Sequence, residues 1–78
     1  MSWTIYSKNN CPYCDKAKAF LQSQAITFIE KKIDEQPEFK EELLGIVPNA
    51  RTVPQIFHHD LCIGGFDKLE AYYMSLTM

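Results

Sequence analysis

The residues of this chain best suited to chemistry are two cysteines separated by two positions, Cys11 and Cys14. A short run of aromatic and β-branched residues, 3–7, precedes them, and apolar residues at helical spacing follow them. If the run forms a strand and a helix begins at Pro12, the Cys11 sulfur lies at the helix N-terminus, where unpaired backbone N–H groups and the helix dipole stabilise an anion. The arrangement therefore predicts a thiolate at Cys11.

The size of the decrease expected in the pKa of Cys11 indicates which chemistry the site can perform. Pro12 suits the first helical turn because the N–H that it lacks would have no partner there, which leaves the N–H groups of Tyr13 and Cys14 as donors to the Cys11 sulfur. A free thiol has a pKa of about 8.5, whereas reactive cysteines reach about 3.5–7.5. The helix dipole contributes only about 0.3–2 kcal/mol, against about 1.4 kcal/mol for each pKa unit, so a large decrease also needs these bonds and the charge of Lys8. A sulfur of low pKa leaves a mixed disulfide readily, which indicates a site that turns over.

The Cys-x-x-Cys spacing has two other interpretations, half of a metal site and coincidence. A zinc site would need further ligands, and the candidates are Cys62 and the adjacent His58 and His59. Neighbouring residues on a strand point to opposite faces, so the two histidines are poorly placed to bind one metal and are expected to be exposed turn residues. Cys62 is expected to be a small buried apolar residue rather than a third redox thiol. A dithiol redox site without a metal is the favoured interpretation.

Composition limits the class of protein. The 78 residues predict a single domain, 1–78, and a hydrophobic content of 46% with 13% aromatic residues predicts a packed core rather than disorder. There is no run of about 20 apolar residues and no signal-peptide pattern, and an odd count of three cysteines argues against a secreted disulfide framework. A net charge of −2 with scattered basic residues gives no footprint for nucleic acid. We therefore expect a cytoplasmic monomer that binds neither nucleic acid nor membrane.

The apolar pattern predicts the order strand, helix, strand, then a helix, then strand, strand and helix. Strands are predicted at 3–7, 27–33, 52–57 and 61–63, and helices at 12–24, 38–44 and 66–76. Gly45 is expected to end the second helix, and residues 58–60 to form a hairpin turn. This order predicts an α/β fold, a four-stranded sheet covered by helices on both faces.

Three motifs occur in the chain: Lys8-x-x-Cys11-Pro12-Tyr13-Cys14, Arg51-Thr52-Val53-Pro54 and Gly64-Gly65-Phe66-Asp67. With these motifs in this order and spacing, the chain resembles a dithiol glutaredoxin of the thioredoxin-fold superfamily over nearly its whole length. The resemblance implies a four-stranded mixed sheet flanked by three helices. In such a sheet the first two strands are parallel, the last two are antiparallel, and the first and last helices share one face.

The resemblance also implies a site for glutathione. The Val53–Pro54 bond is expected to be cis, because the Val53 N–H and C=O would then face the thiols and pair with the cysteinyl unit of glutathione. Thr52 belongs to the same docking segment. Lys8 and Arg51 would face the glycyl carboxylate, and Tyr13 would form a wall of the pocket.

The Gly-Gly motif would complete this site. Gly64 and Gly65 would let the ligand approach the backbone closely, and the helix that starts at Phe66 would present N–H groups to a carboxylate. Asp67 would accept a hydrogen bond from the γ-glutamyl ammonium group.

The function implied is that of a glutathione-dependent thiol–disulfide oxidoreductase with glutathione as co-substrate and no permanently bound cofactor. Its partners would be glutathionylated or disulfide-containing proteins. Cys11 would attack first, and Cys14 would resolve the mixed disulfides formed with proteins. Two alternatives are a redoxin that is reduced by thioredoxin reductase and serves ribonucleotide reductase, and a carrier of a glutathione-ligated iron–sulfur cluster. The cluster carriers of this family usually have glycine in place of Pro12.

Overall fold

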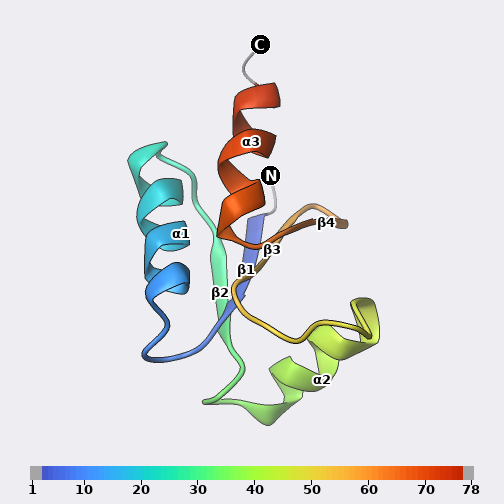
Figure 1. Ribbon diagram of the computed structural model, residues 1–78. Helices are drawn as coiled ribbons and strands as arrows, with labels where there is room; N and C mark the ends of the chain where they lie inside the picture. Colours follow the sequence, from blue (N-terminus) through green and yellow to red (C-terminus); the bar gives the residue numbers. More distant parts are fainter. Residues whose placement is uncertain (1–2, 77–78) are drawn as a thin grey trace.

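The computed structural model describes residues 3–76, which form a four-stranded sheet between helices (Figure 1). The elements in chain order are β1 (Trp3–Ser7), α1 (Pro12–Ser23), β2 (Ile29–Lys32), α2 (Pro37–Ile46), β3 (Gln55–His58), β4 (Leu61–Gly64) and α3 (Phe66–Leu76). The strand order is β2-β1-β3-β4, in which β1 is parallel to β2 and antiparallel to β3, and β4 is antiparallel to β3. The predicted order of elements and the mixed sheet are confirmed.

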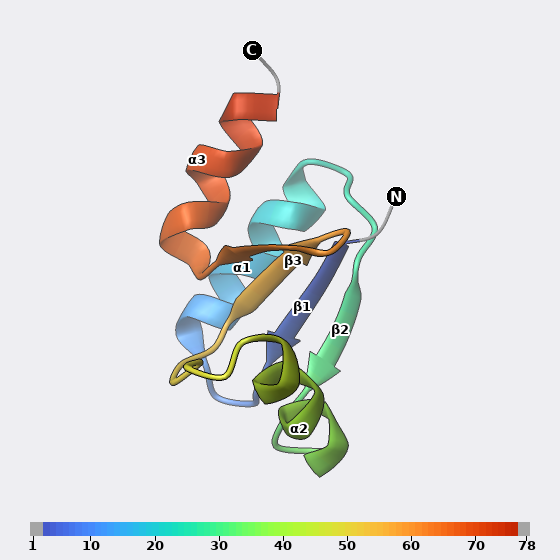
Figure 2. The same ribbon diagram turned by 90° about the vertical axis from the view of Figure 1, so that its right-hand side faces the viewer.

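Two small cores hold the layers together. Helices α1 and α3 cover one face of the sheet, and α2 lies on the other (Figure 2). The α1 and α3 side encloses the buried residues Trp3, Ile5, Ala17, Leu21, Ile56 and Leu69, and the α2 side encloses Tyr6, Leu43 and Phe57. Alternate residues of β1 thus enter opposite cores, because successive side chains of a strand point to opposite faces. Strand β1 is the central support from which the cysteine loop emerges.

The largest differences from the predicted helix and strand bounds are in β3, α2 and β2. β3 begins at Gln55 instead of residue 52, because Pro54 has no N–H to offer to a neighbouring strand. α2 runs through Gly45 to Ile46, so Gly45 does not end it. β2 is confined to Ile29–Lys32. None of the helices in the described part of the chain is long and apolar enough to cross a membrane.

His58 was expected in the turn, and this was wrong. It is the last residue of β3 and is half-buried, its ring stacks on Trp3 with centroids 4.2 Å apart, and its Nδ1 lies 2.8 Å from the Tyr72 hydroxyl. The ring of His59 stacks on that of His58 at 4.5 Å rather than pointing to the opposite face, because His59 has left the strand with a φ of 57°. Stacking on a core tryptophan draws His58 inward.

The half-buried position of His58 predicts a dependence of stability on pH. Burial lowers the pKa of His58, and repulsion by a charged His59 lowers it further. Because folding favours the neutral imidazole, the contribution of His58 to stability is complete above its ordinary pKa of 6.5 and is lost as the pH falls below that value. The midpoint of urea unfolding should therefore decrease as the pH is lowered from about 6.5 to about 5.

A matched pair of variants tests whether His58 causes this decrease in the midpoint of urea unfolding. His58→Phe keeps an aromatic ring on Trp3 and should remove the decrease. His59→Asn should retain most of it, because burial of His58 is the larger cause, and asparagine tolerates the positive φ at this position. The carboxyl groups with lowered pKa values, those of Glu30, Asp34 and Glu42, titrate below this pH range. An unchanged decrease in His58→Phe would show that His58 is not its source.

Candidate active site

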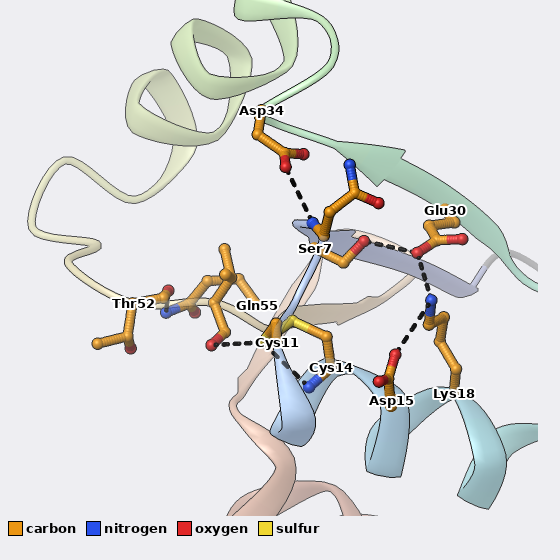
Figure 3. Close-up of a disulfide and its surroundings, with 11 residues drawn as sticks. Ser7, Cys11, Cys14, Asp15, Lys18, Glu30, Asp34, Thr52 and Gln55 are labelled. Carbon is orange, nitrogen blue, oxygen red and sulfur yellow. Dashed lines mark hydrogen bonds and ion pairs between the residues drawn. A yellow bond between two sulfur atoms is a disulfide. The ribbon is translucent and has the colours of Figure 1, made fainter.

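Cys11 occupies the N-cap of α1, as the sequence predicted. Its backbone is extended, with φ −121° and ψ 100°, and the helix begins at Pro12. The Cys14 N–H, one of the two predicted donors, points at the Cys11 Sγ at 3.2 Å, and the two sulfurs form a disulfide (Figure 3). Cys11 therefore receives both the helix dipole and a direct hydrogen bond, the two features that stabilise a thiolate after reduction.

The two cysteines differ in access to solvent. Cys11 is 6% exposed, whereas Cys14, in the first turn of α1, is 0% exposed. A substrate that approaches the protein can therefore contact the Cys11 sulfur first. This asymmetry favours Cys11 as the attacking sulfur and Cys14 as an internal partner.

The loop before β3 reaches the cysteines from the other side. The Cys11 Sγ lies 3.7 Å from the Val53 carbonyl oxygen, and the Val53–Pro54 peptide bond is cis, which confirms the expected conformation. The Gln55 side-chain amide donates to the carbonyl of Thr52, the residue before Val53, at 2.9 Å (Figure 3). The backbone of the loop that leads into β3 thus lies next to the reactive sulfur.

On one side of Val53 lies a pocket of about 450 Å³, here called the Asp67 pocket. Its lining consists of residues of the three sequence motifs: Tyr13, Thr52, Val53, Pro54, Gly65, Phe66 and Asp67. Tyr13 is 60% exposed, and its ring centroid lies 6.4 Å from that of Phe66. A Cβ added to Gly65 would lie 3.3 Å from the Asp67 Oδ1, so glycine keeps the pocket open beside the carboxylate.

On the other side of Val53 lies a pocket of about 340 Å³, the Lys8 pocket. It is lined by Lys8, Ile33, Asp34, Lys40, Leu43, Leu44, Ala50, Arg51, Thr52 and Val53, so it shares Thr52 and Val53 with the Asp67 pocket. Among these described residues, cations outnumber carboxylates by three to one. The carboxylate, Asp34, accepts the Asn9 backbone N–H at 3.0 Å, and this bond lowers the pKa of Asp34. The pocket therefore favours an anion.

Lys40 was missed by the sequence analysis. The charged residues of segment 38–44 are typical of a solvated helix face, and nothing in their spacing singles out Lys40. Its place in the pocket depends on how α2 packs across from the loop that carries Lys8, which is a tertiary feature.

Gly64, also predicted at the site, is not in the lining of either pocket. It ends β4 with a φ of 112°, a conformation that side chains rarely adopt. A Cβ at this position would also lie 3.4 Å from the Lys68 side chain. In this structure the backbone conformation of Gly64 therefore places Gly65 at the Asp67 pocket.

Cys62 was expected to be buried, and this was wrong. It is exposed on the edge strand β4 and lies outside the disulfide, and its Sγ is 3.9 Å from the Gln55 Oε1. Because neighbours on a strand alternate, Ile63 packs against the core and Cys62 faces solvent. Within residues 3–76, no three His, Cys, Asp or Glu side chains gather as a metal-binding group.

Sequence comparisons place these features in a known family. The glutaredoxin family model matches residues 3–63. Glutaredoxin 3 of Escherichia coli K12 is 45% identical over 67 residues, which cover 86% of this chain and 80% of that protein. The glutaredoxin-like protein NrdH of Lactococcus lactis MG1363 is 43% identical, with 81% and 85% covered. A probable glutaredoxin of Synechocystis, slr1562, is 42% identical over 83% of this chain, which spans 60% of that protein.

Solved structures agree with the sequence comparisons. Glutaredoxin 1 from Francisella tularensis, complexed with cacodylate, superposes with a TM-score of 0.81 at 32% identity and covers 97% of this chain and 95% of its own. The glutaredoxin-like NrdH-redoxin from Escherichia coli, described by its thioredoxin-like activity profile, gives 0.75 at 30% identity with 85% and 84% covered. The fold is thioredoxin-like, and with its Cys11–Cys14 pair the chain belongs to the glutaredoxin family.

Proposed function

We propose that this protein is a glutathione-dependent thiol–disulfide oxidoreductase. The observation that carries the proposal is the pair of pockets that meet at Thr52 and Val53 beside the Cys11 sulfur. Glutathione has a cysteinyl thiol between a γ-glutamyl end, which bears an ammonium group, and a glycyl carboxylate. Asp67 suits the ammonium end and the Lys8 pocket suits the carboxylate, with the Val53 backbone between them.

Reduction of a glutathionylated protein needs Cys11 alone. The Cys11 thiolate attacks the glutathionyl sulfur, the bond between that sulfur and the protein breaks, and the protein leaves as a thiolate that takes a proton from water. A second glutathione thiolate then attacks the glutathionyl sulfur on Cys11. This step releases glutathione disulfide and regenerates the Cys11 thiolate.

Reduction of a protein disulfide uses both cysteines. Cys11 attacks one substrate sulfur and forms a mixed disulfide, and Cys14 then attacks the Cys11 sulfur and releases the reduced substrate. The Cys11–Cys14 disulfide that remains is the state seen in this structure. Two glutathione molecules reduce it and become glutathione disulfide. The protein is proposed to act as a monomer on glutathionylated and disulfide-containing proteins.

The NrdH relatives support a second candidate function. The resemblance to a protein named NrdH and to a redoxin with a thioredoxin-like activity profile favours a redoxin that thioredoxin reductase reduces and that serves ribonucleotide reductase. Such a redoxin needs the Cys11–Cys14 pair but has no need for charge complementarity in the flanking pockets. The contribution of those charges to turnover therefore discriminates between the two functions.

Two variants test the glutathione site. Lys8→Ala should raise the KM for glutathione by less than about tenfold, since an exposed ion pair contributes only about 0.2–1 kcal/mol. It should also raise the pKa of Cys11, because the ammonium group favours the thiolate. Asp67→Ala should raise the KM without changing that pKa, since its proposed partner is the distant γ-glutamyl end. Both values can be measured, by glutathione kinetics and by titration of the thiolate absorbance.

Lys68→Ala is the matched control, because Lys68 is exposed on α3 and is not in the lining of either pocket. It should leave the KM for glutathione unchanged. The glutathione site would be wrong if Asp67→Ala behaved like this control and 2-mercaptoethanol supported turnover as well as glutathione does. The redoxin reduced by thioredoxin reductase would then be the better proposal.

A further inference from the structure

A side chain at the start of β3 reaches back to the loop between the two pockets. The Gln55 Nε2 donates to the Thr52 carbonyl oxygen at 2.9 Å (Figure 3). Gln55 is the first residue of β3, and its register partner is Tyr6 on the central strand β1. Gln55 therefore connects the sheet to Thr52 and Val53, the two residues that both pockets share.

The loop formed by residues 51–54 receives little other support from hydrogen bonds. Within residues 3–76, none of its backbone groups takes part in a backbone–backbone hydrogen bond, and the Gln55 amide is the one N–H group that donates to it. The other end of this amide also has a contact, because the Cys62 Sγ lies 3.9 Å from the Gln55 Oε1. Contacts at both ends of the amide direct its N–H toward Thr52.

The Thr52 carbonyl and the Val53 N–H belong to one peptide unit, and this unit is trans, since the cis bond of the described chain is the next one, Val53–Pro54. A trans peptide unit is planar, and its C=O and N–H point in opposite directions. The Val53 N–H has no hydrogen-bond partner among residues 3–76. By holding the Thr52 carbonyl oxygen, Gln55 therefore fixes the direction of a free backbone donor in the residue whose carbonyl lies next to the Cys11 sulfur.

We propose that Gln55 is a positioning residue for glutathione, which orients the Thr52–Val53 peptide so that the Val53 N–H can pair with the cysteinyl unit. The inference rests on the proposed function. Gln55 lines neither pocket, so it acts only through the peptide that it holds. A donor that is already oriented costs less conformational entropy when a ligand binds. Gln55 should therefore strengthen the binding of glutathione and leave the intrinsic reactivity of the Cys11 thiolate unchanged.

The test compares two disulfides that differ in their ability to pair with the Val53 backbone. Glutathione disulfide carries peptide groups, whereas 2-hydroxyethyl disulfide has none. The reduced parent protein carries Cys14→Ser and Cys62→Ser, so that Cys11 is the one remaining thiol, and the serine at position 62 keeps an O–H that can donate to Gln55. The Cys11 thiolate attacks one sulfur of the disulfide, forms a mixed disulfide and releases one thiolate. The rate constant is measured by acid quenching and mass spectrometry.

Gln55→Met keeps a side chain of similar length and removes the amide. It should lower the rate constant for glutathione disulfide about two- to tenfold, the range expected for one hydrogen bond, and leave the rate constant for 2-hydroxyethyl disulfide unchanged. Gln22→Met is the matched control, because Gln22 is exposed on α1 and lines neither pocket. It should change neither rate constant.

An NMR measurement follows the proposed donor itself. When Cys11 of the parent protein forms its mixed disulfide with glutathione, the resonance of the Val53 amide proton should move downfield, and it should move less in Gln55→Met. The inference is overturned if Gln55→Met reacts with glutathione disulfide as fast as the parent, if both rate constants fall equally, or if the Val53 resonance does not respond.

Failure of the proposed function gives a different result. The parent protein would then show no greater preference for glutathione disulfide over 2-hydroxyethyl disulfide than a small thiol shows in solution, and the role of Gln55 would be overturned together with the glutathione site. A parent that prefers glutathione disulfide, with the same preference in Gln55→Met, would overturn the role of Gln55 alone.

Discussion

Replacing Cys11 by serine should abolish both the reduction of glutathionylated proteins and the reduction of protein disulfides. Cys11 is the sulfur that holds the N-cap position of α1 and receives the Cys14 N–H, whereas a serine hydroxyl at this place stays protonated and cannot form a mixed disulfide. Activity is measured on a glutathionylated peptide and on a protein disulfide, and both rates should fall to the background without enzyme.

Cys62→Ser is the control for this variant, since Cys62 is an exposed thiol outside the active site. It should retain both activities. Residual turnover by Cys11→Ser that Cys62→Ser removes would place the nucleophile on β4 and contradict the assignment.

Cys14→Ser should separate the two activities. Release of a glutathionylated protein needs only Cys11 and free glutathione, so that rate should be retained. Reduction of a protein disulfide should fall at least about 100-fold, because dissolved glutathione must then replace a thiol held next to the mixed disulfide at a high effective concentration. The two substrates are compared at the same glutathione concentration. Equal losses on both would mean that Cys14 supports the site structurally instead of resolving mixed disulfides.

Local sequence signals predicted the framework of the fold correctly. The run Trp3–Ser7 forms the central strand because its alternate residues enter both cores, and Pro12 begins α1 at the residue where its missing N–H costs nothing. The cis bond before Pro54 was a different kind of prediction. It came from the resemblance to glutaredoxins, since X-Pro bonds in folded proteins are cis in only about 5–6% of cases.

The errors concern residues whose environment is set by distant parts of the chain. Gly45 lies inside α2 because Leu43 in the same turn is buried against the sheet, and this packing outweighs the low helix propensity of glycine. His58 turns inward because Trp3 and Tyr72 offer it a ring to stack on and a hydroxyl. Cys62 faces solvent because the register of β4 gives the inner position to Ile63. Trp3 and Tyr72 lie far from His58 in the sequence, and Leu43 and Ile63 are buried by packing against distant parts of the chain.

The candidate site also combines features set by the local sequence with features set by tertiary packing. Each of the three sequence motifs is a contiguous run of residues. Together they supply the cysteines, the Val53 segment and the Asp67 pocket, so their residue types and spacing were informative. The Lys8 pocket draws on α2 through Lys40 and Leu43, and its positive charge arises in a chain whose net charge is −2. Such a local excess of positive charge depends on tertiary packing and cannot be derived from the composition.

The central claim is dependence on glutathione, and a comparison of reductants tests it most directly. Turnover of a glutathionylated peptide and of a protein disulfide is measured with glutathione, glutathione reductase and NADPH, and in parallel with thioredoxin reductase and NADPH. If the protein depends on glutathione, both substrates should be turned over steadily in the glutathione system and very slowly with thioredoxin reductase. Turnover supported by thioredoxin reductase, together with an inactive glutathione system, would contradict it.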